Sequence, residues 1–235
     1  MCLQSGIANE PAALRRFPNV QGVSVACPTS HLEPGVVQAW SAPVTGLLDI
    51  GVYPTGIDQI SEAVAAEFRA ATFSSYPVDD IRRWKHRKLL TNLGDAIEAV
   101  CGPHARQGPL GDMLLAEGEA VLSAAGHEAA TAEEDRTRRA DLLQLGEIAG
   151  QTRPGGSSWQ GLRRGTGDIE TDYLNSTARS CSSAGYMAFR HPPTTCCSDW
   201  HESLPSPAMR PARLRQRRSW SDSKRPRKPA RPASG

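Results

Sequence analysis

The chain has 235 residues, 39% hydrophobic and 22% charged, so its length allows one large or two small globular domains. No stretch reaches the ~18 apolar residues of a transmembrane helix, and the N-terminus has neither the basic start nor the apolar core of a secretory signal. We therefore expect a cytoplasmic protein whose six irregularly spaced cysteines are reduced thiols.

The net charge of +2 hides an uneven distribution of charged side chains. Residues 1–209 carry 17 basic and 24 acidic side chains, whereas residues 210–235 carry ten basic side chains and one acid, Asp222. Such a split indicates two regions of different origin or role.

The first part of the chain predicts short strands and turns. Residues 20–27 and 36–42 partly alternate between apolar and polar, and residues 46–52 form a third apolar run. Pro and Gly separate these runs, as is typical of strands joined by turns. After a helix, residues 73–78 predict one more short strand.

The middle of the chain predicts helices. Residues 58–71 have apolar residues at helical spacing. Residues 79–101 give the clearest helix, which Asp79 or Asp80 would cap and Gly102 would end. Further helices are predicted at residues 111–125, at 132–148 behind a Thr131–Glu134 capping box, from Ser157 or Ser158 to residue 162, and at 168–174.

The periodic pattern ends after Asn175. Residues 176–235 are dominated by Ser, Pro and Arg, with too few apolar residues to offset the ordering entropy of ~1–2 kcal/mol per residue, so we expect disorder. The basic stretch at residues 210–235 would give nonspecific binding to nucleic acid or another polyanion. One interpretation is therefore a nonenzymatic interaction protein with a basic nucleic-acid-binding tail.

Three segments, in this order and at this spacing, resemble the ketopantoate reductase (2-dehydropantoate 2-reductase) family. They are Leu3-Gln4-Ser5-Gly6 with Ala8-Asn9-Glu10, the sequence WKHRKLLTN at residues 84–92, and SSWQ at 157–160 leading to ETDYLN at 170–175. The resemblance covers roughly residues 1–175.

The resemblance implies a two-domain enzyme in which a Rossmann domain binds NADPH and a helical domain covers the cleft. Such an enzyme reduces the ketone of a 2-keto acid, ketopantoate, to the alcohol of pantoate. In this chain, residues 1–75 would be an α/β remnant of the nucleotide-binding domain. Residues 76–175 would be a helical substrate-binding domain of the 6-phosphogluconate dehydrogenase C-terminal type, and residues 176–235 the disordered tail.

The resemblance also implies site residues. Lys88 would be the catalytic lysine near the substrate carbonyl, and Glu170 would hold the substrate hydroxyl. Asn92, Ser158 and Ser5 would bind the substrate. The chemistry agrees, because hydride delivery to a ketone develops negative charge on oxygen, which an ammonium group stabilises and protonates. Without the resemblance, a lysine and an asparagine four residues apart are more often solvated surface residues of a helix.

The chain departs from the family in its nucleotide-binding part. No G-x-G-x-x-G motif follows an opening strand, and the chain begins at the late part of a Rossmann domain. We therefore expect no proper NADPH site and no reductase activity from this chain alone. Ser5 also stands where the family has asparagine, a residue with a longer reach.

A second departure follows Asn175. With suitable codons, residues 178–204 can be read in a shifted frame as EIVLLGRLHGVPTPTNVLQRLARVA, which fits the family's continuation. We therefore predict that residues 176–235 are a frameshift product, which the codons of the gene decide.

The remaining motifs predict neither a metal site nor a hydrolase. His191, Cys196, Cys197 and His201 do not have the spacing of a tetrahedral site. The Ser157–Ser158 pair lacks a G-x-S-x-G elbow.

Overall fold

The structure is a computed structural model, and it describes residues 1–102 and 106–165, which belong to one compact unit. These residues form helices and sheets, which confirms the expected mixed α/β character. Glu170, the helix predicted at 168–174, the tail at 176–235 and the frameshift hypothesis lie outside the described residues. Within residues 1–102 and 106–165, no helix combines the length and hydropathy that a membrane span requires.

A small sheet forms the centre of the first half of the chain. β1 (Cys2–Leu3) pairs in parallel with β2 (Gln21–Ala26), and β2 pairs antiparallel with β6 (Leu47–Val52). The segment predicted as a strand at 73–78 runs parallel to β6, with bridges at Ser74 and Pro77. Backbone hydrogen bonds from Leu48 to Ser74, from Ile50 to Tyr76 and from Val78 to Ile50 join it to β6. The strands expected at 20–27 and 46–52 are confirmed.

One face of this sheet forms the hydrophobic core with α2 (Gln59–Ala70). Because side chains alternate along a strand, Val23 and its partner Ile50 point to the same face. They pack there with Leu48 and with Ala65 of α2, all of them buried. Asp58 caps α2 in a reciprocal capping box with Ser61, which confirms the helix predicted from residue 58.

The other face carries small and polar residues, and α3 (Ile81–Cys101) lies against it. Gly22 and Gly51 sit beneath Ile81, which is fully buried. A Cβ atom on Gly51 would lie 2.2 Å from the carbonyl oxygen of Val78, so only glycine fits this close approach. Asp80 caps α3 and Gly102 ends it, as the sequence predicts.

Two short pairs of antiparallel strands extend from this centre. β3 (Thr29–Ser30) pairs with β4 (Gln38–Ala39), and β5 (Ser41–Pro43) pairs antiparallel with β7 (Leu143–Leu145). The second pair joins the regions that the sequence assigns to separate domains at 1–75 and 76–175, so this boundary stays a prediction.

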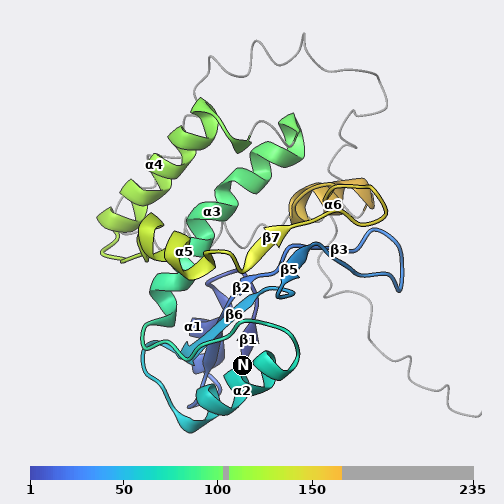
Figure 1. The fold of residues 1–235 in the computed structure, drawn as a ribbon. Coiled ribbons are helices and arrows are strands. Elements are labelled where there is room, and N and C mark those ends of the chain that lie inside the picture. Colours follow the sequence, from blue (N-terminus) through green and yellow to red (C-terminus); the bar gives the residue numbers. More distant parts are fainter. Residues whose placement is uncertain (103–105, 166–235) are drawn as a thin grey trace, which may run out of the picture. The chain divides into compact units, whose positions relative to one another are not determined.

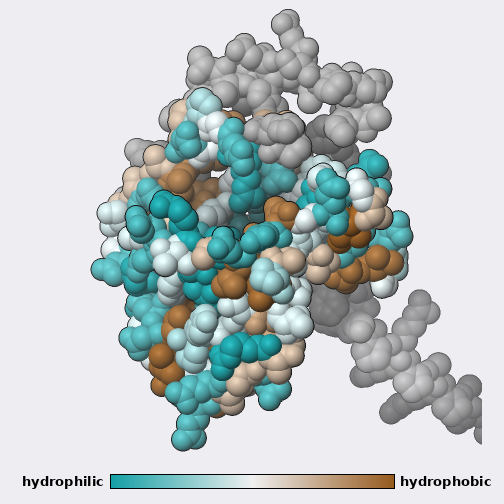
Figure 2. Space-filling model, in the orientation of Figure 1, coloured by the Kyte–Doolittle hydropathy of each residue, from teal (hydrophilic) through white to brown (hydrophobic). Residues whose placement is uncertain are grey.

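The remaining helices are α1 (Asn9–Leu14), α4 (Pro109–Ala124), α5 (Ala132–Arg139) and α6 (Ser157–Arg163). α4 and α6 both pack against α3, and α4 runs beside it (Figure 1). On the face drawn in Figure 2, hydrophobic side chains form separate groups among hydrophilic ones.

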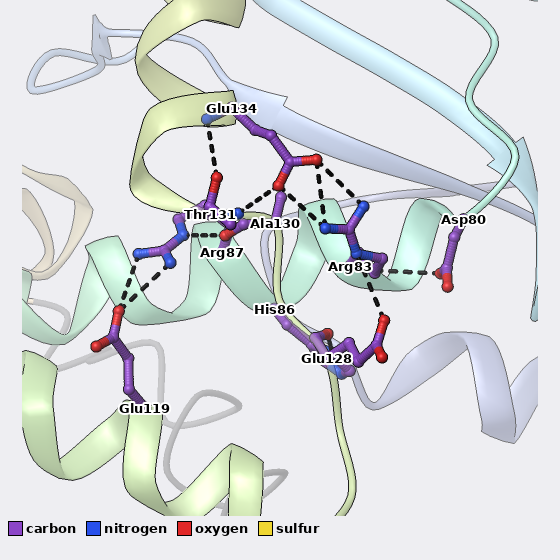
Figure 3. Close-up of polar contacts among 9 residues, drawn as sticks. All are labelled: Asp80, Arg83, His86, Arg87, Glu119, Glu128, Ala130, Thr131 and Glu134. Atoms are coloured by element: carbon purple, nitrogen blue, oxygen red, sulfur yellow. Dashed lines mark hydrogen bonds and ion pairs between the residues drawn. The ribbon is translucent and has the colours of Figure 1, made fainter.

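Arginines of α3 hold α4 and α5 in place (Figure 3). Arg83 forms a two-pronged contact with Glu134 of α5, with Nη2 3.0 Å from Oε2. Arg87 donates to the carbonyl oxygen of Ala130 and pairs with Glu119 of α4 at 3.3 Å. Such forked contacts fix orientation as well as distance.

Three local predictions from the sequence are wrong. The helix that opens with the Thr131–Glu134 capping box ends at Arg139 instead of residue 148, because Ala140 adopts a positive φ of 33° and the chain then forms β7. Gly156, not Ser157 or Ser158, occupies the N-cap of α6. The helix α1 was not expected, because six residues are too few to show a periodic pattern.

A buried ion pair joins α5 to the sheet. Arg138 donates to both carboxylate oxygens of Asp49 on β6, at 2.8 and 2.7 Å, and also to Ser74 at 3.2 Å. Its guanidinium lies over the ring of Tyr76, 4.8 Å from the ring centroid.

We predict that Arg138→Ala lowers the free energy of unfolding by about 3–5 kcal/mol, because it leaves the buried Asp49 carboxylate without its partner. The matched control is Arg136→Ala on the same helix, where an exposed pair with Glu133 contributes at most about 0.5 kcal/mol. Urea denaturation followed by circular dichroism measures both changes. Equal effects of the two variants would contradict the predicted role of the ion pair.

Candidate functional site

Lys88 lies where α3, α5 and the sheet meet. It lines a small cavity of about 20 Å³ together with residues from β2, β6 and α5, among them Ser24, Asp49 and Arg139. A cavity of this volume holds about one water molecule. The side chain is half-buried, so the ammonium group is largely removed from bulk water.

This environment changes the acidity of Lys88. Burial, together with the cation of Arg139, lowers the pKa of Lys88 to about 8, and the carboxylate of Asp95 opposes the shift. The ammonium is therefore still the main form at neutral pH but gives up its proton more readily than an ordinary lysine. A group of this kind suits general acid catalysis near neutral pH.

A cluster of opposite charges occupies the next turns of α3. The carboxylates of Asp95 and Glu98 are both buried. Arg106 contacts Asp95, lies 3.5 Å from Glu98, and donates to the carbonyl oxygen of Thr91 at 2.7 Å. Burial raises the pKa of Asp95, while Arg106 and Lys88 act in the opposite direction.

The start of α6 closes over this cluster. The backbone N–H of Gly156 donates to Oε1 of Glu98 at 3.0 Å. A Cβ atom on Gly156 would lie 3.3 Å from Oδ1 of Asp95, so the missing side chain lets α6 approach the carboxylates. Ser158, two residues further, is buried on this helix.

Gln160 fixes α6 to the loop after β2. Its amide nitrogen donates to the carbonyl oxygens of Thr29 and Gly155, both at 3.0 Å. Its amide oxygen accepts from the backbone N–H of His31 at 2.9 Å. Since Gln160 is buried, these bonds hold the Ser158 helix rigidly against α3 and β3.

Arg153 adds a further cation to the cluster. Burial lowers the pKa of Arg153, while Glu98 and Asp95 counteract the shift. The thiol of Cys27, at the end of β2, lies within the field of both Lys88 and Arg153, and burial raises the pKa of Cys27. The cluster thus contains two carboxylates and three cations, which are Lys88, Arg106 and Arg153.

The loop that carries Ser5 reaches α3 one turn before Lys88. Lys85 donates to the carbonyl oxygens of Gln4 at 2.9 Å and Val23 at 3.2 Å, and its Nζ lies 2.5 Å from Oε1 of Glu10. Burial lowers the pKa of Lys85, and the charge of Glu10 opposes the shift.

The structure gathers four of the five predicted site residues around α3. Lys88 and the buried Asn92 lie on successive turns of α3, Ser158 lies on α6, and Ser5 lies on the loop bound by Lys85. Glu170 lies outside the described residues. That these four residues act together on one substrate stays a prediction.

The sequence did not indicate the arginines of this region as site residues. Arg106 lies 8 and 11 residues from its partners Glu98 and Asp95, and Arg153 lies 55 and 58 residues from the same two carboxylates, so no helical spacing indicates either arginine. Asp95 and Glu98 did carry a signal, since they continue the spacing of Lys88 and Asn92 along one face of the helix.

Two solved structures share this arrangement of elements. No protein-family model matches the sequence. The structure of 2-dehydropantoate 2-reductase from Methylococcus capsulatus superposes with a TM-score of 0.57 at 18% identity, covering 77% of this chain and 62% of that one. This chain has the fold of 2-dehydropantoate 2-reductase. The same enzyme from Geobacter metallireducens gives a TM-score of 0.55 at 20% identity, with 76% and 61% covered.

The chain spans about three fifths of the length of these 2-dehydropantoate 2-reductases. We tested whether the described residues fit the pyrophosphate of a dinucleotide, which usually sits at the N-terminus of a helix that follows a strand. The turn between β1 and α1 contains a single glycine, Gly6, and α1 has only six residues. The closely spaced glycines that let a backbone approach a pyrophosphate are absent from this turn, so this turn does not fit the group.

The described residues also contain no group of three or more His, Cys, Asp or Glu side chains placed to hold a metal ion. His191, Cys196, Cys197 and His201 lie outside them.

We predict that the pKa of Lys88 is about 8 in the folded chain and rises in Arg139→Gln, because the variant removes the strongest neighbouring cation. The matched control is Arg136→Gln, an exposed position on the same helix, which should leave the pKa unchanged. The ¹³Cε shift of labelled lysine, followed by NMR between pH 6 and 11, measures the titration. A wild-type Lys88 that titrates at the ordinary value of about 10.4 would show that the ammonium is fully solvated.

Proposed function

We propose that this chain is a 2-dehydropantoate 2-reductase-like protein that binds a 2-keto acid at Lys88 but does not reduce it unaided. The observation that carries the proposal is the partly buried lysine, with its pKa lowered to about 8, on the helix that also carries Asn92. The fold shared with the two reductases supports this assignment.

The charge of the site suits an acidic substrate. The site contains three cations and two carboxylates, so one positive charge remains in excess for a substrate carboxylate. The cations are Lys88, Arg106 and Arg153, and the carboxylates are Asp95 and Glu98. In this proposal, the Lys88 ammonium donates a hydrogen bond to the keto oxygen and would supply the proton when charge develops there. Asn92, one turn away, orients the substrate.

Ser158 completes the proposed binding half of the cleft. It lies on α6, which Gln160 and the bond between Gly156 and Glu98 hold in place. Glu170, the second proposed catalytic residue, would orient the substrate hydroxyl, and it lies outside the described residues.

The proposal requires a local movement. The cavity at Lys88 has room for about one water molecule, which is too little for a 2-keto acid. The wall of this cavity includes Arg138 and Arg139 at the end of α5, where the chain turns at Ala140. We infer that the side chain of Arg139 moves outward when the substrate binds, while the ion pair between Arg138 and Asp49 keeps the end of α5 on the sheet.

Reduction also needs NADPH as the source of hydride, and the turn between β1 and α1 does not fit its pyrophosphate. No hydride step can therefore be derived from these residues. We propose that the 235-residue chain binds 2-dehydropantoate but does not oxidise NADPH in its presence.

We predict that 2-dehydropantoate binds to the purified chain with an affinity that falls as the pH rises through about 8, because Lys88 loses its charge there. Lys88→Met should lower the affinity at pH 7 by about tenfold, the loss of one charge-assisted hydrogen bond. Lys88→Arg should keep binding at pH 9, because an arginine stays charged. Isothermal titration calorimetry at pH 6, 7, 8 and 9 measures all three.

Two results would contradict the proposal. If Lys88→Met binds as tightly as the unaltered chain, the acid is held elsewhere. If the unaltered chain oxidises NADPH when 2-dehydropantoate is added, the chain has a working dinucleotide site and the proposal is wrong. Circular dichroism of each variant confirms that a loss of binding is not a loss of fold.

A further inference from the structure

A second and larger pocket opens on a different face of α3. It has a volume of about 390 Å³ and lies between α1, the first turns of α3 and the ring of Tyr53. This volume falls within the range of small-molecule pockets, roughly 300–1,000 Å³. Its lining from α3 is Arg82, Lys85 and His86, whereas the cavity at Lys88 is lined from α3 by Trp84 and Lys88.

The floor of this pocket contains a carboxylate without a full set of partners. Glu10 is completely buried and lines the pocket. Oε1 is paired with the ammonium of Lys85 at 2.5 Å, whereas Oε2 has no hydrogen-bond partner among the described residues. A buried carboxylate oxygen left in this way costs free energy unless a donor reaches it.

Lys85 cannot supply the missing bond. Two of its three donors already go to the carbonyl oxygens of Gln4 and Val23. A donor for Oε2 of Glu10 must therefore come from the pocket side, and because Glu10 is completely buried, the donor reaches this oxygen only when lining side chains shift.

The rim of the pocket is positively charged. Arg15, on the exposed end of α1, and Arg82, on α3, both line it. Together with the neutralised Glu10–Lys85 pair, these two arginines give the lining two positive charges in excess when the histidines are neutral, and Asp80, 3.6 Å from Arg82, offsets part of this excess. Arginines at such a rim favour a carboxylate or phosphate group.

The floor also distinguishes between kinds of donor. A ligand ammonium would stand next to the Lys85 ammonium and be repelled by it. A hydroxyl group can donate to Oε2 of Glu10 without adding charge. The apolar walls, from Ile7, Ala8 and Pro11, suit a short carbon chain between the two groups.

From this geometry we propose that the pocket over Glu10 is a binding site for a small organic anion that carries a hydroxyl group. The anionic group pairs with Arg15 and Arg82, and the hydroxyl donates to Glu10. The two histidines of the lining, His86 and His127, have ring centroids 5.1 Å apart and report on occupancy.

The probe is glycerol 3-phosphate, and its matched control is n-propyl phosphate, which has a similar length and charge but no hydroxyl. Isothermal titration calorimetry on the full chain should give glycerol 3-phosphate about tenfold tighter binding, the equivalent of one added hydrogen bond. NMR of the histidine rings should show shifts at His86 and His127. Sodium glycerate, tested alongside, shows whether a carboxylate can replace the phosphate.

Two variants test the assigned partners. Arg15→Ala with Arg82→Ala should weaken both phosphates alike, by about tenfold. The double variant Glu10→Leu with Lys85→Met removes the buried pair together, which is often tolerated. It should bind both phosphates equally, because the hydroxyl has lost its acceptor.

Three results would each overturn the proposal. The unaltered chain does not bind glycerol 3-phosphate measurably, or it binds both phosphates with equal affinity, or it binds glycerol 3-phosphate without an NMR shift at His86 or His127. If Glu10→Leu with Lys85→Met does not fold, the affinities of the two phosphates for the unaltered chain and for Arg15→Ala with Arg82→Ala still test the proposal. Lys88→Met should leave the affinity for glycerol 3-phosphate unchanged, because Lys88 does not line this pocket. This proposal can therefore fail while the proposal for Lys88 stands, and the reverse.

Discussion

The ion pair between Lys85 and Glu10 holds α3 against the sheet, and the other features of the molecule depend on the position of α3. Both side chains are almost completely removed from water. Their removal from water costs several kcal/mol for each ion, so the pair is tolerated only because it forms together with hydrogen bonds to Gln4 and Val23. These bonds join α1, β1 and β2 to one point on α3.

The same helix places two lysines in different chemical situations only three residues apart. The ammonium of Lys85 lies 2.5 Å from Oε1 of Glu10, and this ion pair has a structural role. Lys88 faces a small cavity, and within the described part of the chain no carboxylate lies in ion-pair distance of it. Burial without a close partner is what lowers the pKa of Lys88 to about 8. The neighbouring side chains, and not the position in a sequence pattern, thus distinguish the structural Lys85 from Lys88, whose pKa lies near neutral pH.

Charged contacts also account for how the helical part is fixed. Arg83 and Arg87 join α5 and α4 to α3, and Arg138 joins α5 to the sheet, each through a carboxylate. Apolar packing contributes as well, since Gly118 of α4 lies close to Leu90 and Leu93 of α3. The ion pairs add a specific geometry to this packing even where their net stabilisation is modest.

The sequence by itself determined where most helices and strands lie, because capping residues and apolar spacing act locally: Asp58 and Asp80 start their helices as expected. It also placed Lys88 and Asn92 on one face of one helix, since helical periodicity follows from spacing alone. Only the tertiary structure decided that Arg106, Arg153 and α6 surround that face, and that α5 ends at Arg139 so that the chain can pair with β5. The physical reason is distance along the chain: Gly156 meets Glu98 across 58 residues, and no local propensity records such a contact.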